Sequence, residues 1–144
     1  MTPDPAVRTE SVNVLFTKPD ETLEAVRVAS AIGRAMAVPL TVTHLRAVPY
    51  PLTLDAPAGL SPAETEAFVE RVRAEGIDVR VRVYLCRNAD RMLPMAFKEH
   101  SVIVIGGRRS WWPTWSERMR RRLEAAGHFV LFVDVPEHQE VSRA

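Results

Sequence analysis

Residues 101–116 read Ser-Val-Ile-Val-Ile-Gly-Gly-Arg-Arg-Ser-Trp-Trp-Pro-Thr-Trp-Ser, and this stretch decides the fold. A run of β-branched residues ends in two glycines and continues into a polar, aromatic loop. Such a run, bounded by turn residues, is typical of a strand buried on both faces of a parallel sheet. Ligands of open α/β sheets bind beyond the carboxyl ends of the strands. We therefore expect the functional site in the loop that follows residue 105.

The same alternation extends to both sides of this stretch. Apolar runs predict strands at 12–16, 40–45, 79–85, 102–105 and 129–135. Periodic spacing and capping residues predict helices at 21–37, 62–75 and 89–100, and one from a cap at Ser116 to residue 126. Strict alternation of strand and helix indicates a single five-stranded parallel sheet with helices on both faces, an α/β, Rossmann-like fold.

Length and composition restrict the class of protein. The chain has 144 residues, which suits one domain, and we place it at residues 11–135 between polar tails at 1–10 and 136–144. A net charge of +1 gives no general attraction to nucleic acid or to an acidic membrane. Cys86 is the only cysteine, so neither an intrachain disulfide nor a thiolate zinc cluster is expected. We see no apolar run of membrane-spanning length and no signal sequence, and predict a cytoplasmic protein.

Several of these segments together resemble the universal stress protein family. The segments are 14–16 followed by 20–22, then 40–45, 86–89, 102–106, 116–118 and 129–133. The resemblance implies strand order 3-2-1-4-5, a nucleotide beside the end of the first strand with its phosphates on the loop after the fourth, and a homodimer through the last strand. The proline-rich stretch of this chain at 48–57 is similar to versions of the domain that are fused to amino-acid permeases. Carried over onto this chain, the nucleotide or anion site falls on Thr17, Lys18, Pro19, Leu45, Gly106, Gly107, Arg108, Arg109, Ser110 and Ser116.

Two of these positions depart from the nucleotide-binding pattern. Thr17 stands where the family often has an aspartate, and Arg109 stands where the second glycine of the phosphate loop belongs. Glycines matter there because backbone N–H groups must approach phosphate oxygens with no Cβ in the way. No cofactor is therefore expected, and ATP is kept as an alternative ligand. Lys18, Arg108 and Arg109 offer another route to an anion, through charge-assisted hydrogen bonds.

The tryptophans of the loop, Trp111, Trp112 and Trp115, admit three interpretations. They could pack the loop onto the end of the sheet, anchor a protein interface, or stack on a ligand base. Arginines at 118, 120, 121 and 122 follow them. We interpret these as a solvated helix face, with binding of single-stranded nucleic acid as the weaker alternative.

Catalysis has little support in the sequence. We find no P-loop, no Gly-x-Gly-x-x-Gly after the first strand and no Gly-x-Ser-x-Gly. His44 is expected in the core and Cys86 as a structural thiol, and no metal site is predicted. We expect a protein that is not an enzyme.

The sequence thus predicts a regulatory or stress-associated module that acts through protein contacts. The last strand would lie at a sheet edge with Phe129, Leu131 and Val133 as the dimer contact, because an exposed apolar edge is a template for pairing. An unidentified protein partner is also possible. The alternative function is a sensor of ATP or another anionic nucleotide between the first and fourth strands.

Overall fold

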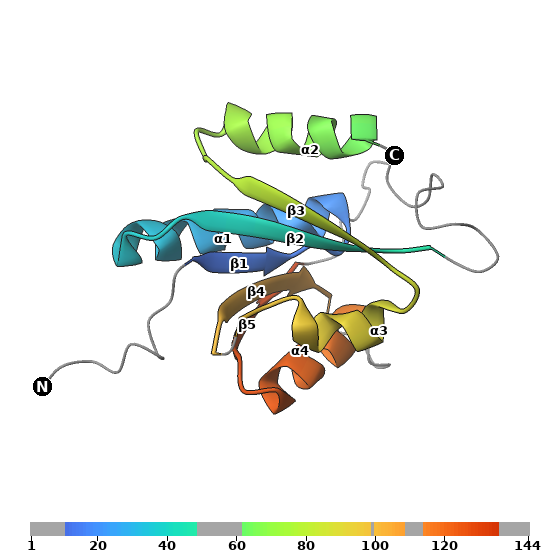
Figure 1. The fold of residues 1–144 in the computed structure, drawn as a ribbon. Coiled ribbons are helices and arrows are strands. Elements are labelled where there is room, and N and C mark those ends of the chain that lie inside the picture. The colour runs from blue at the N-terminus through green and yellow to red at the C-terminus, as the bar shows by residue number, and fades with distance from the viewer. Residues whose placement is uncertain (1–10, 49–61, 99, 109–113, 136–144) are drawn as a thin grey trace, which may run out of the picture.

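A computed structural model describes residues 11–48, 62–98, 100–108 and 114–135 (Figure 1). The strands are β1 (Val12–Leu15), β2 (Leu40–Ala47), β3 (Arg80–Cys86), β4 (Val102–Gly107) and β5 (Phe129–Asp134). The helices are α1 (Pro19–Met36), α2 (Pro62–Ala74), α3 (Ala89–Met92), the 3-10 turn η2 (Leu93–Met95) and α4 (Trp115–Ala125). The alternation that the sequence predicts is confirmed.

The five strands form one sheet in the order β3-β2-β1-β4-β5, and every neighbouring pair is parallel. The predicted sheet and its strand order are therefore confirmed. Leu15 of β1 lies in register with Thr43 of β2 and with Ile105 of β4. β3 and β5 are the two edge strands. The carboxyl ends of β1 and β4 are neighbours because the chain leaves β1 toward one edge and returns to β4 on its other side.

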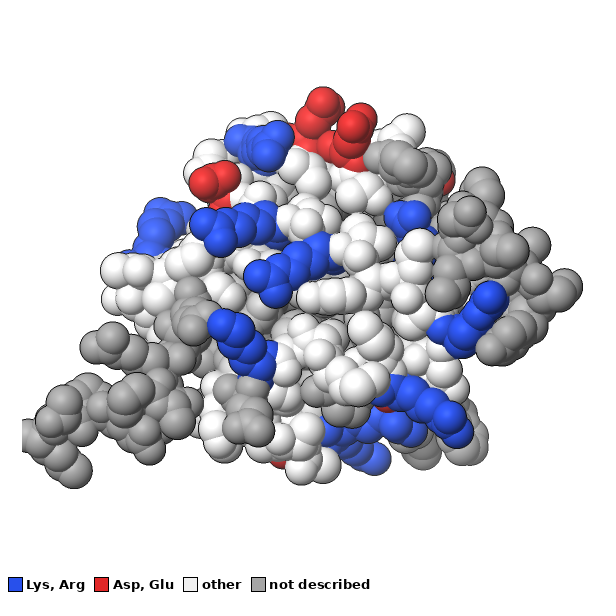
Figure 2. Space-filling model, viewed as in Figure 1, with Lys and Arg blue, Asp and Glu red and all other residues white. Residues whose placement is uncertain are grey.

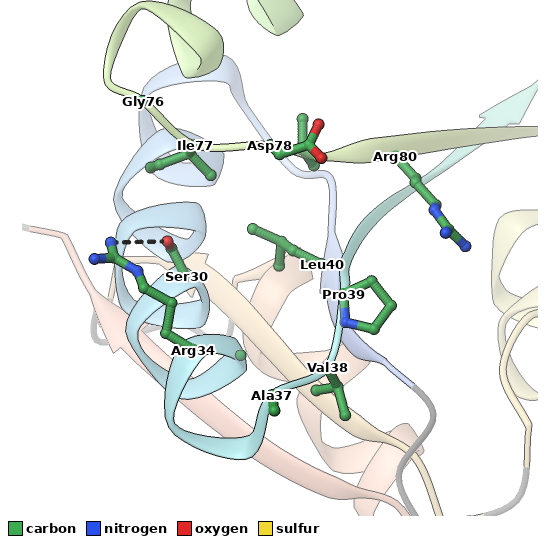
Figure 3. A pocket seen from close by; sticks show the side chains of 12 residues that line it. Ser30, Arg34, Ala37, Val38, Pro39, Leu40, Gly76, Ile77, Asp78 and Arg80 are labelled. Carbon is green, nitrogen blue, oxygen red and sulfur yellow. Dashed lines mark hydrogen bonds between the residues drawn. The ribbon is translucent and has the colours of Figure 1, made fainter.

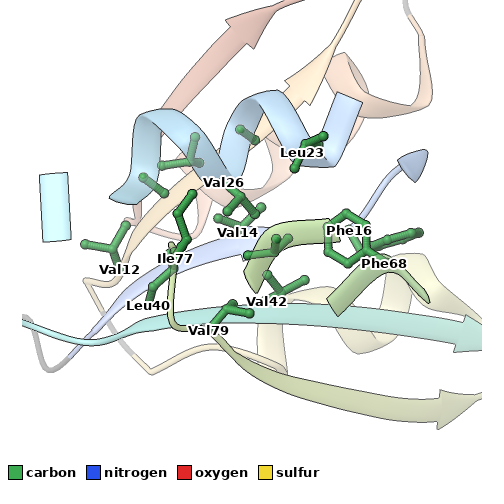
Figure 4. Close-up of a cluster of buried hydrophobic side chains, with 14 residues drawn as sticks. Val12, Val14, Phe16, Leu23, Val26, Leu40, Val42, Phe68, Ile77 and Val79 are labelled. Carbon is green, nitrogen blue, oxygen red and sulfur yellow. The ribbon is translucent and has the colours of Figure 1, made fainter. Parts of the chain in front are cut away.

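One face of the sheet is covered by α1 and α2 (Figure 4). α1 begins at Pro19, which suits a first helical position, and Asp20 and Glu21 follow in its first turn. The apolar residues of α1 recur every three or four positions, so that one side of the helix packs on the sheet. The resulting first core cluster comprises Val12, Val14, Phe16, Leu23, Ala25, Val26, Ala29, Leu40, Val42, Phe68, Val72, Ile77, Val79 and Val104.

The other face of the sheet is covered by α3, η2 and α4 (Figure 1). The second core cluster comprises Leu15, Leu45, Cys86, Leu93, Ala96, Phe97, Ile103, Ile105, Met119 and Leu123. Alternate residues of β1 and β4 supply the two clusters, since successive side chains of a strand point to opposite faces. Fully buried central strands explain why the sequence shows continuous apolar runs there.

Two sequence expectations are wrong in detail. The helix predicted at 89–100 stops as an α-helix at Met92 and continues as a short 3-10 turn that contains Pro94. Proline lacks the N–H that an α-helix interior needs, so it ends the regular hydrogen bonding there. The last helix is capped by Thr114, whose hydroxyl oxygen accepts from the Glu117 N–H at 3.2 Å, and Ser116 lies inside the helix.

Among the described residues, no helix is both long enough and apolar enough to cross a membrane.

Candidate functional site

The predicted site lies where β1 and β4 end, which we call the β1–β4 junction. Thr17 follows β1, and its hydroxyl oxygen lies 3.1 Å from the carbonyl oxygen of Gly106 at the end of β4. The Thr17 N–H also donates to the hydroxyl oxygen of Thr22 at 3.0 Å. Residues far apart in sequence thus meet at this end of the sheet, as the topology requires.

Glu21 is the residue of the junction that sequence reasoning missed. Its side chain is only 11% exposed, although it carries a carboxylate. One carboxylate oxygen lies 3.1 Å from the Thr17 hydroxyl, and the other lies 3.8 Å from Nε of Arg108. The Thr17 proton can be donated either to this carboxylate or to Gly106. The acidic first turn of α1 was a visible signal, but it marks a helix start in any protein and does not show that one acid turns inward.

The glycines of the junction serve close packing of helices. A Cβ on Gly106 would lie 2.1 Å from the carbonyl oxygen of Glu21, so only glycine lets α1 approach β4 there. A Cβ on Gly107 would lie 2.6 Å from the Cβ of Ser116, which is buried at the start of α4. Both glycines are explained by packing without any bound phosphate.

The remaining described residues of the predicted anion site differ in their exposure to solvent. Lys18 and Pro19 are exposed at the start of α1, and Arg108 is half-buried. Leu45 is buried in the second core cluster, so its side chain faces the protein interior. Arg109 and Ser110 lie outside the described residues, and so do Trp111 and Trp112. The role of this set in binding an anion stays a prediction.

The described carboxylates at the junction already face arginines of the chain. Glu21 lies 3.8 Å from Arg108, and Asp20 lies 3.5 Å from Arg71 of α2. A buried carboxylate that faces Arg108 opposes the entry of an anion, because like charges repel most strongly where water is scarce. The arrangement is therefore less favourable to phosphate than the sequence alone suggests.

His44 and Cys86 have the environments of structural residues. The His44 ring packs against Phe16, with ring centroids 4.7 Å apart. Burial, helped by the nearby positive charge of Arg46, lowers the pKa of His44 to about 4. Burial raises the pKa of the Cys86 thiol, which keeps it protonated and unreactive. The described residues contain no group of His, Cys, Asp and Glu that could hold a metal ion.

The predicted interface residues fall into two groups. Phe129 and Leu131 on β5 are 78% and 43% exposed. Val133 is partly buried against the first core cluster, and Trp115 packs partly against the second. Of the predicted interface residues that the structure describes, only Phe129 and Leu131 are largely exposed.

A separate hollow of about 520 Å³ lies at the opposite, amino-terminal end of β2 and β3 (Figure 3). Its lining includes Ser30 and Arg34 of α1, with Asp78 and Arg80 from the chain entering β3. Arg34 donates to the Ser30 hydroxyl at 3.2 Å, while Figure 3 shows the Arg80 side chain pointing away from Asp78. Arg80 therefore forms no ion pair with the described residues of this hollow.

Comparison with known proteins agrees with the geometry of the fold. No protein-family model matches the sequence, and no curated protein matches it. Among solved structures, a universal stress protein from Archaeoglobus fulgidus superimposes with a TM-score of 0.63 at 18% identity, over 89% of this chain and 95% of that one. A structure of the universal stress protein from the same organism in complex with dAMP gives 0.58 at 17% identity, over 89% and 99%. A universal stress protein in complex with cAMP gives 0.57 at 18% identity, over 90% and 100%.

These likenesses define the class of protein as an open, doubly wound α/β domain. More particularly, the chain has the universal stress protein fold, which confirms at the level of the fold the resemblance seen in the sequence.

Proposed function

We propose that this chain is a non-catalytic regulatory, stress-associated module of the cytoplasm that works as a homodimer through β5. The observation that carries the proposal is the apolar surface of Phe129 and Leu131 on an edge strand. Alternation along β5 places both residues on one face, while Phe132 packs on the second core cluster. An apolar edge of this kind is usually covered in natural proteins, and a second copy would cover it.

Sedimentation velocity tests the dimer. We expect a species of twice the chain mass of 16.2 kDa at micromolar concentration. Leu131→Arg should give a monomer, because it places a charge in the apolar contact. Val83→Arg on the opposite edge strand is the matched control, since Val83 is 39% exposed and Leu131 43%. A monomeric wild-type protein, or equal dissociation in both variants, would overturn the proposal.

A sensor of an anionic nucleotide is the second candidate. Thr17, Lys18 and Arg108 lie at the β1–β4 junction, and two proteins of similar fold are described in complex with dAMP and cAMP. The buried Glu21 carboxylate weighs against it. A thermal-shift titration with ATP and magnesium, and with AMP, distinguishes the two functions. No shift favours the non-nucleotide module, whereas a shift that Arg108→Ala abolishes favours the sensor.

A further inference from the structure

Charge is distributed unequally between the α1/α2 side and the α3/α4 side of the sheet, toward which Arg80 and Arg82 of the edge strand β3 project. The helices α1 and α2 carry six carboxylates and four arginines, whereas β3, α3 and α4 carry three carboxylates and seven arginines. Figure 2 shows Lys and Arg side chains spread over one face of the molecule, whereas the visible Asp and Glu side chains gather mainly near α2. The net charge of +1 is therefore the sum of a more acidic α1/α2 side and a more basic α3/α4 side.

Two of the three carboxylates on β3, α3 and α4 form ion pairs with arginines of the same elements. Asp90 lies 3.7 Å from Arg122, and Glu124 lies 3.1 Å from Arg120. Glu117 is partly buried, and one of its carboxylate oxygens is fully enclosed. The carboxylates that these elements supply therefore leave most of their arginines unneutralised.

The exposed arginines of this layer that form no ion pair within the described chain are Arg80, Arg82, Arg91, Arg118 and Arg121. We call these five residues the basic face. Arg118 and Arg121 are three positions apart on α4, so they lie on the same side of that helix, away from the buried Met119 and Leu123. Arginine is well suited to phosphate because its planar group donates two parallel hydrogen bonds.

β3 adds an aromatic ring to the basic face. Arg80, Arg82 and Tyr84 alternate along β3 and therefore project from the same face of the sheet. Tyr84 is partly buried against the second core cluster, which fixes the ring, and both arginines beside it are exposed. After β3 the chain forms only one turn of α-helix, α3, and continues as η2 after Met92. Guanidinium groups beside an aromatic ring suit a single strand, whose bases are free to stack.

We propose that the basic face binds single-stranded nucleic acid, with Arg80 and Arg82 contacting phosphates and Tyr84 stacking on a base. The proposal is independent of the dimer and of the β1–β4 junction. An anionic lipid surface is the competing partner, since Met95 on the neighbouring η2 is 74% exposed. The arginines outnumber such apolar anchors on this layer, which favours the nucleic acid.

Fluorescence polarisation with labelled oligo(dT) and oligo(U) of about 20 nucleotides tests the proposal on the intact protein. One phosphate contact from each of the five arginines of the basic face predicts a log–log salt slope of about −3.5, so affinity should fall about 100-fold between 50 and 200 mM salt. Arg80→Gln with Arg82→Gln should reduce the slope to about −2. Tyr84→Leu, which keeps the packing, should weaken binding about tenfold.

The matched control is Arg27→Gln with Arg71→Gln, which removes the same charge from the other layer and should leave binding and slope unchanged. Circular dichroism verifies that each variant is folded. The proposal is overturned if neither oligonucleotide binds at 50 mM salt, if the control loses as much affinity as the β3 double variant, or if vesicles rich in phosphatidylserine bind while the oligonucleotides do not.

Discussion

Arginines at the β1–β4 junction and on the basic face meet different surroundings. Arg108 at the junction faces the buried carboxylate of Glu21, and glycines bring two helices close around it. Arg80 and Arg82 on β3 are exposed and have no ion-pair partner in the described chain. Arginine is thus paired with a carboxylate of the chain at the junction, whereas on β3 it is exposed and forms no ion pair with a described residue. The number of arginines in a sequence therefore does not locate an anion site, because the nearby carboxylates decide which arginines are available.

The largest effect is expected from filling the junction. Gly106→Ala should lower the free energy of unfolding by about 3 kcal/mol, because its Cβ would meet the backbone of Glu21 at 2.1 Å. Gly76→Ala is the control: it has φ of +77° and nothing within 4 Å, so only conformational strain of about 1 kcal/mol applies. Urea unfolding followed by circular dichroism measures both. If both variants lose the same free energy of unfolding, α1 can move away from β4 at little cost, and the close packing at Gly106 is not needed for stability.

Acidification should destabilise the fold because His44 stays neutral in the folded protein while it gains a proton in the unfolded chain. The pKa of His44 is lowered by burial to about 4, so the folded state disfavours its protonation. Stability is fully present above the unfolded pKa near 6.5 and should be lost by about 1–2 kcal/mol, allowing for solvent screening, as pH falls toward 4. His128, whose pKa is lowered by burial and by His100, adds to the loss in the same direction.

Unfolding midpoints measured from pH 7 to 4.5 test this expectation. His44→Gln should lose less stability over that interval than the wild type. A flat stability profile in the wild type would contradict the expected cost of charging this ring.

Removing the internal carboxylate should weaken the exclusion of anions from the junction. Glu21→Gln keeps an oxygen for the Thr17 hydroxyl but no longer faces Arg108 with a negative charge. Pyrophosphate at ten times its dissociation constant would then stabilise the variant by about 1.4 kcal/mol, with little effect on the wild type. Scanning fluorimetry measures the shift, and Glu24→Gln, a more exposed acid of the same helix, is the control. Identical midpoints in all three proteins with pyrophosphate would show that Glu21 does not exclude anions.

The smallest effect compares two adjacent arginines of α4. Arg120 pairs with Glu124 and lies 6.0 Å from the ring centre of Phe132, whereas Arg121 is exposed and without an ion pair in the described chain. Arg120→Gln should cost about 1 kcal/mol, and Arg121→Gln should stay within about 0.5 kcal/mol. Thermal unfolding of both variants checks the difference. A larger loss for Arg121→Gln would mean that the basic face contributes to folding.

Sequence reasoning reached the fold because the central strands are buried on both faces. Val102 to Ile105 had to be apolar throughout, and that pattern is visible without coordinates. Pro94 is visible in the sequence, but whether a proline bends or ends a helix depends on the packing around it. Local sequence therefore predicted the elements better than it predicted their ends.

Only part of the candidate site could be predicted from the sequence. The meeting of Thr17 and Gly106 followed from the topology. The inward turn of Glu21 did not, because an acid in the first turn of a helix is also favoured by the helix dipole. The alternating arginines of β3 are visible in the sequence, but that they have no ion pair with a described carboxylate is a property of three dimensions.

Gly106 and Gly107 together set how closely the helices of the two layers pack on β4. As consecutive residues of one strand, they face opposite sides of the sheet, and each is pressed by the first turn of a different helix, α1 or α4. On one side the Glu21 carbonyl lies against Gly106, and on the other the Ser116 side chain and the Phe132 ring lie against Gly107. A larger residue at either position would push a helix away from the sheet, so two adjacent positions of β4 set the spacing of both helical layers.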